Sequence, residues 1–310
     1  MTPRRVSLPA GAAAYVFGEA TRRRAAEEKI VERLRAAGYR EAIVPSADYL
    51  APYAPHLNAR EERELYRFVD RQGDTLALRA DFTIALARHL AARLTEDAEA
   101  TRVFYRGEVL RGGAGEGSTA ESYHIGAELL GVPGPPADLE IARCCLDVLA
   151  AGGVERVHVI LGAVGALEAL LAPERTEKEA GDLARQISQR RLAETASEAA
   201  RVSPEFARRV RRLLEGGLPP DDPLLARLPA GAGLAAVARG LSGRSGCEVA
   251  VDLAEPASRS YYTGFFFAVY GATGGEPIAR GGRYDGLYAA FGAARPAVGF
   301  SLGLEGIAGS

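Results

Sequence analysis

The sequence changes character twice, and these two changes restrict its possible folds more than any other feature. Residues 163–242 consist mostly of Ala, Arg, Glu and Leu at helical spacing. Segments typical of β-strands lie before this stretch, at 102–111, 122–131 and 157–161, and after it, at 247–253, 261–270, 276–282 and 297–303. We therefore expect an α+β core formed by residues 1–162 and 243–310, with a helical insertion at 163–242.

The strand segments follow one another closely, and short turns such as GATGGEP join them. Consecutive strands with hairpin-like turns favour an antiparallel sheet. Helical periodicity predicts helices that flank this sheet, and two further short strands are expected as well. The predicted helices span 19–37, 84–94 and 136–151, and the short strands span 40–46 and 75–80.

Composition argues against several classes of function. The net charge of −2 provides no basic field for nucleic acid, and no apolar run reaches membrane-spanning length. The N-terminal segment lacks the pattern of a signal peptide. Three cysteines give neither a disulfide framework nor a zinc spacing, so we expect a cytoplasmic protein. His56, His89 and His158 are not clustered, and we predict no metal site and no catalytic residue.

The strand predicted at 122–131 carries polar residues on one face. Alternation places His124, Gly126 and Glu128 on the same side, opposite a face of apolar residues. A carboxylate and an imidazole on either side of a glycine are typical of a pocket floor that a ligand approaches closely. A solvent-facing side of the strand would give the same pattern, so both interpretations stay open.

Other candidate site residues each have an ordinary structural explanation. Tyr261 and Tyr262 lead a strand that is apolar on both faces, where they need polar partners if buried. Asp81 and Thr83 suit the N-terminus of a helix. The remaining candidates are an opposite-charge pair on one strand, Arg106 and Glu108, and two residues after a glycine pair, Arg283 and Tyr284.

Taken in order, these segments resemble the class II aminoacyl-tRNA synthetase fold, and specifically its histidyl branch. GYREAIVPSADYL resembles motif 1, FYRGEVLR motif 2 and VGFSLGLEGIA motif 3, while SRSYYTGFFFAVY and ARGGRYDGL resemble the two histidine-specific signatures. The resemblance implies a class II antiparallel sheet flanked by helices. It also implies a histidine pocket made by Asp81, Thr83, His124, Glu128, Tyr261, Tyr262, Arg283 and Tyr284, with Arg106 and Glu108 contacting a nucleotide or phosphate.

The chain departs from the synthetases at residues that act on ATP. Gly306 stands where motif 3 of the synthetases has an arginine, and by our alignment Ala257 replaces a second one, with Arg259 shifted by two positions. The motif 2 loop GGAGEGSTA lacks the expected basic residues. We also expect the protein to lack the anticodon-binding domain that follows motif 3 in the synthetases. Fixed arginines stabilise the charge that develops in adenylate formation, and losing one such group costs roughly 10²–10³ in rate.

This combination resembles the regulatory subunits of ATP phosphoribosyltransferase. The resemblance implies a non-catalytic subunit in histidine biosynthesis that binds L-histidine as a feedback effector and requires no cofactor. It also implies a short-form catalytic partner, a hetero-octamer containing homodimers of this chain, and no tRNA or membrane. Two alternatives stay open: a ligase that attaches histidine to tRNA or another acceptor and uses ATP and Mg²⁺, and a scaffold with a vestigial pocket.

Overall fold

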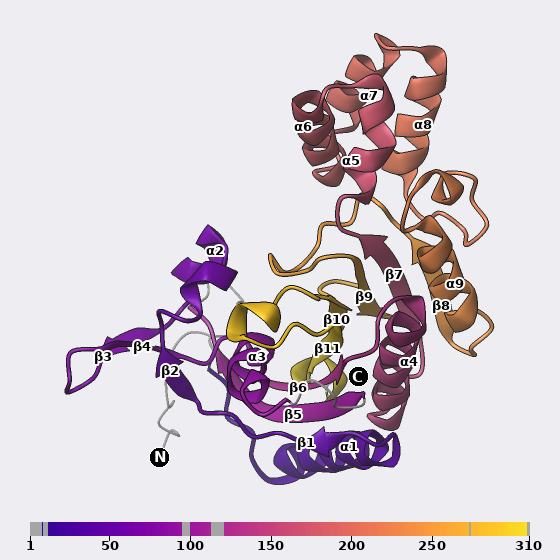
Figure 1. The fold of residues 1–310 in the computed structure, drawn as a ribbon. Helices are drawn as coiled ribbons and strands as arrows, with labels where there is room; N and C mark the ends of the chain where they lie inside the picture. The colour runs from indigo at the N-terminus through magenta and orange to yellow at the C-terminus, as the bar shows by residue number, and fades with distance from the viewer. Residues whose placement is uncertain (1–7, 9–11, 95–99, 113–120, 273, 309–310) are drawn as a thin grey trace, which may run out of the picture.

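The computed structural model describes residues 8, 12–94, 100–112, 121–272 and 274–308. An eight-stranded sheet runs through the molecule in the order β1-β5-β6-β11-β10-β9-β7-β8 (Figure 1). Its strands are β1 (Arg40–Glu41), β5 (Thr101–Leu110), β6 (Glu121–Leu130), β7 (Val157–Ala163), β8 (Cys247–Val251), β9 (Phe265–Gly271), β10 (Ala279–Arg283) and β11 (Ala297–Gly303).

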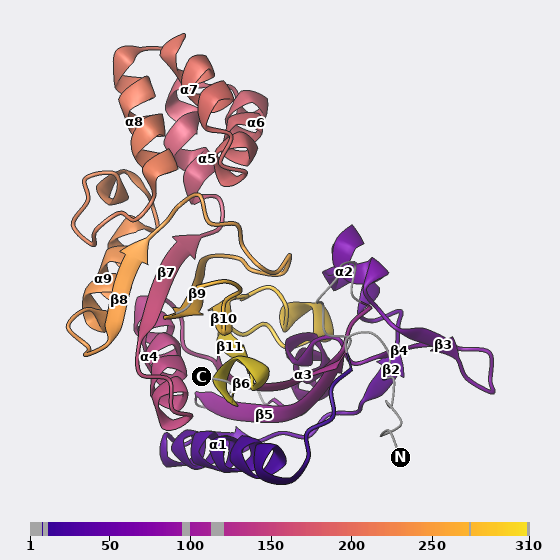
Figure 2. The ribbon, with the colours of Figure 1, turned by 180° about the vertical axis from the view of Figure 1, so that it is seen from behind.

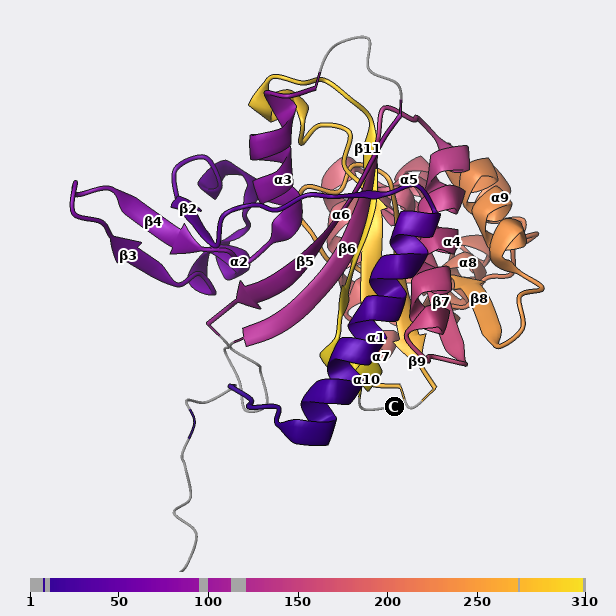
Figure 3. The same ribbon diagram turned by 90° about the horizontal axis from the view of Figure 1, so that it is seen from below.

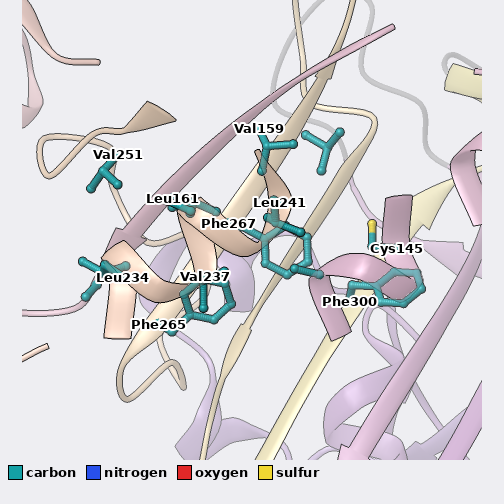
Figure 4. Close-up of a cluster of buried hydrophobic side chains, with 14 of the residues drawn as sticks. Cys145, Val159, Leu161, Leu234, Val237, Leu241, Val251, Phe265, Phe267 and Phe300 are labelled. Carbon is teal, nitrogen blue, oxygen red and sulfur yellow. The ribbon is translucent and has the colours of Figure 1, made fainter. Parts of the chain in front are cut away.

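One face of the sheet is covered by three long helices, α1 (Phe17–Ala36), α4 (Pro135–Ala151) and α9 (Gly231–Leu241) (Figure 3). The largest apolar cluster lies between these helices and the strands. Phe265 and Phe267 of β9 pack there beside Val237 and Leu241 of α9, as Figure 4 shows. This layer holds the strands rigid, so side chains on the opposite face are presented from fixed positions.

The opposite face carries α3 (Phe82–Ala91) and a smaller sheet of order β2-β4-β3. The small sheet consists of β2 (Ala47–Tyr49), β3 (Arg67–Val69) and β4 (Thr75–Leu78), and the short helix α2 (Ala59–Arg63) lies beside it (Figure 1). Arg79 links the two sheets, because its guanidinium donates to the carbonyl oxygens of Val44, Pro45 and Glu108 at 2.8–3.1 Å.

The segment between β7 and β8 is helical, and its first four α-helices stand at the end of β7, away from the rest of the sheet (Figure 2). Its helices before α9 are α5 (Ala166–Leu171), α6 (Glu177–Ser188), α7 (Leu192–Ala200) and α8 (Pro204–Glu215). Helix α9 differs from these four, since it packs against α4 and covers the sheet. The predicted division into a core and an insertion at 163–242 stays a prediction.

The predicted antiparallel arrangement holds for the middle of the large sheet and is wrong at its two edges. Strand β1 pairs with β5, and β7 with β8, in parallel. Parallel neighbours need a long crossover connection, and both pairs have one: the small sheet with α3 joins β1 to β5, and the helical segment joins β7 to β8. Strand β9 also begins at Phe265, so Tyr261 and Tyr262 precede the strand that was expected to contain them.

Candidate ligand pocket

The deepest polar residue on the α3 side of the sheet is Glu128 of β6. Its side chain has no solvent exposure, and its Oε1 accepts a hydrogen bond of 2.8 Å from Thr83 Oγ1. Its Oε2 has no hydrogen-bond partner. Burial raises the pKa of Glu128 well above its ordinary value of 4.5, while the Thr83 hydrogen bond opposes the shift.

A glycine on the neighbouring strand makes room for this carboxyl group. Gly299 of β11 pairs with Glu128 in the sheet, and a Cβ on Gly299 would overlap Glu128 Oε2. The same Cβ would lie 2.7 Å from Tyr284 Oη, which also lacks a hydrogen-bond partner. Two buried polar groups without partners therefore lie side by side, which is costly unless something else satisfies them.

Helix α3 delivers the next two predicted residues. Asp81 caps the helix, accepting hydrogen bonds from the backbone of Thr83 at 2.8 Å and Ile84 at 3.2 Å. The expected capping role of Asp81 is thus present. Its other oxygen, Oδ2, accepts a hydrogen bond from Tyr261 Oη at 3.4 Å.

The tyrosines form one wall of the pocket. Tyr261 packs edge-on against Tyr262 and Tyr284, with ring centroids 5.4 and 5.6 Å away. Tyr262 lies over Gly282, where an added Cβ would come 2.8 Å from its ring. Burial raises the pKa of Tyr261 well above its ordinary value, so its hydroxyl stays a neutral donor.

His124 lies on the same strand face as Glu128, as alternation predicts. Its Nδ1 is 3.0 Å from Ser301 Oγ on β11. Burial, together with the charges of Arg111 and Arg259, lowers the pKa of His124 to about 3. The imidazole is therefore neutral at physiological pH.

Two arginines that sequence reasoning did not assign to the pocket lie at its outer end. Arg111 and Arg259 line a cavity together with Asp81 and Tyr261. Arg259 forms ion pairs with Glu61 Oε1 at 3.2 Å and with Asp81 Oδ2 at 3.4 Å. Burial and the neighbouring charge of Arg259 lower the pKa of Arg111 to about 10. Two guanidinium groups facing one cavity favour an anionic ligand group between them.

Arg283 lies on the opposite face of the sheet from these residues. Its Nε donates to Asp138 Oδ1 of α4 at 2.8 Å, its Nη1 to Asp285 at 3.0 Å and its Nη2 to the carbonyl of Gly134 at 3.0 Å. The guanidinium is thus fully engaged in holding α4 to β10. The structure does not bring Arg283 together with the other predicted pocket residues.

Arg106 and Glu108 are likewise absent from the pocket. Arg106 points toward α1, where it donates to Glu27 and Glu41, each at 2.8 Å. Glu108 is exposed on the same strand. Alternation along β5 places Tyr105 and Gly107 on the pocket side instead. In this placement Arg106 joins β5 to α1, and a nucleotide or phosphate contact of Arg106 and Glu108 stays a prediction.

Gly306, which replaces the motif 3 arginine, lies in the short helix α10 (Glu305–Ala308). The preceding Glu305 forms an ion pair of 2.6 Å with Arg23 of α1 and accepts from the backbone of Tyr123. A Cβ on Gly306 would come 3.0 Å from Ile278. Of the motif 2 loop 112–120, only Gly112 lies within the described residues.

The pocket arginines were missed because their roles depend on where the chain turns. Arg111 follows the last residue of β5, and its Nε turns back to donate to the carbonyl of Ala80 at 2.8 Å. Arg259 lies in the loop before β9. The sequence did offer one indication of their role. Arg111 lies in FYRGEVLR and Arg259 lies in SRSYYTGFFFAVY, and both segments resemble motifs of the synthetase family.

Among the residues that the structure describes, no helix is long and apolar enough to cross a membrane, and no group of three or more His, Cys, Asp or Glu could hold a metal ion.

Comparison with known proteins shows which family this chain resembles. The family model described as histidyl-tRNA synthetase matches residues 12–307. Two ATP phosphoribosyltransferase regulatory subunits, from Moorella thermoacetica and Bordetella pertussis, are each 34% identical to the chain. The alignments cover 97% of this chain and 80% and 81% of theirs.

Solved structures agree on the fold. A Bacillus halodurans protein described as an ATP phosphoribosyltransferase regulatory subunit/histidyl-tRNA synthetase aligns with a TM-score of 0.85 at 26% identity, over 99% of this chain and 83% of that one. The histidyl-tRNA synthetase of Nostoc sp. aligns with a TM-score of 0.75 at 18% identity, over 96% and 73%, which shows the shared fold alone.

Proposed function

Because the chain belongs to the family of ATP phosphoribosyltransferase regulatory subunits, we propose that it binds L-histidine in the pocket beside α3 and so controls a catalytic partner. Its role is regulatory, and the proposal involves no catalytic residue and no cofactor. ATP and Mg²⁺ would enter only if the chain were a ligase.

The observation that carries the proposal is a pair of buried groups without hydrogen-bond partners, Glu128 Oε2 and Tyr284 Oη, which both lie next to Gly299. Glu128 Oε2 can accept a hydrogen bond, and Tyr284 Oη can donate or accept one. A neutral imidazole has one N–H donor and one acceptor nitrogen. A histidine side chain inserted here would therefore satisfy both groups, and the neighbouring tyrosines would exclude water.

The outer end of the pocket suits the rest of an amino acid. Arg111 and Arg259 offer guanidinium groups for a carboxylate. Asp81 Oδ2, already beside Tyr261, offers an acceptor for an ammonium group. His124 is neutral and adds no repulsion to that ammonium group. In this arrangement the ligand spans the pocket from Glu128 to the arginines.

The proposed partner is a catalytic ATP phosphoribosyltransferase subunit. The names of the curated relatives describe regulators of that enzyme. A similar fold, with a TM-score of 0.70 at 21% identity, occurs in a structure described as an ATP phosphoribosyl transferase complex from Thermotoga maritima. Feedback requires that histidine bind more tightly to one state of the assembly than to the other. We also propose that this chain forms homodimers and that these assemble with the catalytic subunits into a hetero-octamer.

One experiment separates this role from a ligase. We would measure histidine-dependent ATP–pyrophosphate exchange, and histidine inhibition of a short-form ATP phosphoribosyltransferase mixed with this chain. The proposal predicts no exchange above background and inhibition only when this chain is present. Exchange well above background would instead indicate a working histidine ligase.

A further inference from the structure

We propose that residues 57–66, which contain α2, report whether the two pocket arginines hold an anionic ligand group. This inference rests on the proposed function and specifies how that site is regulated. Four residues of this segment, Leu57, Glu61, Glu64 and Leu65, line the cavity that also contains Arg111 and Arg259.

The first link joins α2 to Arg259 through a side chain. Glu61 Oε1 pairs with Arg259 Nη1 at 3.2 Å. Glu61 Oε2 accepts from Ser260 Oγ at 3.1 Å and, within the capping box of α2, from the backbone of Asn58 at 2.9 Å. Glu61 is 11% exposed at its side chain, so this ion pair is shielded from water.

The second link joins the same segment to Arg111 through the backbone. Leu65 and Arg111 form an isolated antiparallel bridge. Gly112 also donates its backbone N–H to the carbonyl of Glu64 at 2.6 Å. The two guanidinium groups that face the cavity thus belong to residues that both contact this segment, Arg259 at its middle and Arg111 near its C-terminal end.

A ligand carboxylate would compete with Glu61 for Arg259, since both are acceptors for the same guanidinium. Binding would then weaken the side-chain link that holds α2. The loosened segment ends at the exposed Tyr66 and leads directly into β3, where Phe68 and Val69 are exposed. Occupancy of a buried pocket would in this way change the mobility of an exposed surface.

Hydrogen exchange measured by mass spectrometry on the full chain tests the links without any ligand. We would compare wild type with Arg259→Met and Glu61→Gln, since glutamine keeps the capping box. Glu62→Gln is the matched control, because it removes an ion pair between α2 and Arg67 that is exposed on both sides and lies outside the cavity. We expect exchange in 57–66 to rise roughly two- to fivefold in each pocket variant. The double variant should show no further rise, and the control should resemble wild type.

Unchanged hydrogen exchange in Arg259→Met and Glu61→Gln would overturn the inference, as would an equal rise in Glu62→Gln. A ligand arm uses L-histidine and histidinol, which lacks the carboxylate. Histidine should raise hydrogen exchange in 57–66, and histidinol should not. An equal effect of both compounds would contradict the competition between the ligand carboxylate and Glu61. If calorimetry detects no histidine binding, the proposed ligand is wrong, and the comparison of variants still decides the links.

Discussion

Glu128 shows how a single buried residue makes the stability of the fold depend on pH. The unfolded chain titrates near 4.5, whereas burial raises the pKa of Glu128 in the folded protein. The folded state therefore binds the carboxyl proton of Glu128 more tightly than the unfolded chain does. The stability that Glu128 contributes consequently falls as the pH rises above 4.5 toward the raised pKa.

We predict that Glu128→Gln removes this loss of stability at higher pH and weakens histidine binding. Glutamine keeps the size of the side chain but carries no charge to bury. Thermal unfolding of both proteins between pH 5 and 9 should show a shallower decline for the variant. An identical decline in both proteins would mean that Glu128 is not the group responsible.

His124 gives a prediction of the opposite sign. Its folded pKa of about 3 lies below the ordinary 6.5, so its contribution to stability is complete above pH 6.5 and is lost as pH falls. We expect His124→Gln to reduce acid destabilisation by about 2 kcal/mol at pH 5. Urea unfolding at pH 5 and 8 checks this, and an equal pH dependence in both proteins would contradict it.

At the scale of elements, the ion pair between Arg283 of β10 and Asp138 of α4 explains why Arg283 lies away from the pocket. The ion pair with Asp138 is buried on both sides, with side chains 8% exposed. Removing one member leaves the other buried without its partner, which typically costs about 3–5 kcal/mol.

We predict that Arg283→Met destabilises the fold by about that amount and leaves histidine affinity unchanged in the molecules that remain folded. The double variant Arg283→Met/Asp138→Leu should recover part of the lost stability, because no unpaired charge remains. Weakened histidine binding with unchanged stability would instead make Arg283 a ligand contact.

Elements were predicted from sequence where one periodicity governs a long segment. The alternation in 122–131 correctly placed His124 and Glu128 on one face, and the helical spacing of 19–37 found α1 to within two residues. Helix α2 and strand β3 were missed because they are only five and three residues long and lack buried side chains. Arg106 was assigned to a ligand because alternation fixes the two faces of a strand without saying which faces the pocket.

At the scale of the whole molecule, the fold retains the architecture of a synthetase while two arginine positions of the ATP site differ. Gly306 carries no charge, and Arg259 reaches the pocket from a shifted position where Glu61 and Asp81 already hold it. The proposed function, sensing of an amino acid without its activation, rests on these differences.

We predict that Gly306→Arg alone does not create adenylate formation, because an arginine at 306 does not replace the second one lost at Ala257. A Cβ at this position would lie 3.0 Å from Ile278 Cγ2, so the side chain of Ile278 must shift to make room for it. Pyrophosphate exchange with this variant should stay at background. Clear exchange would show that Arg259 performs the role assigned to the missing residue.

The central claim is that Glu128, whose Oε2 has no hydrogen-bond partner, belongs to a histidine site. The most direct test is a calorimetric titration of L-histidine into the intact protein and into Glu128→Gln. We predict saturable binding to the wild type and at least about a tenfold weaker affinity in the variant, which corresponds to 1.4 kcal/mol. Absence of binding to the wild type, or equal affinities in the two proteins, would contradict the claim.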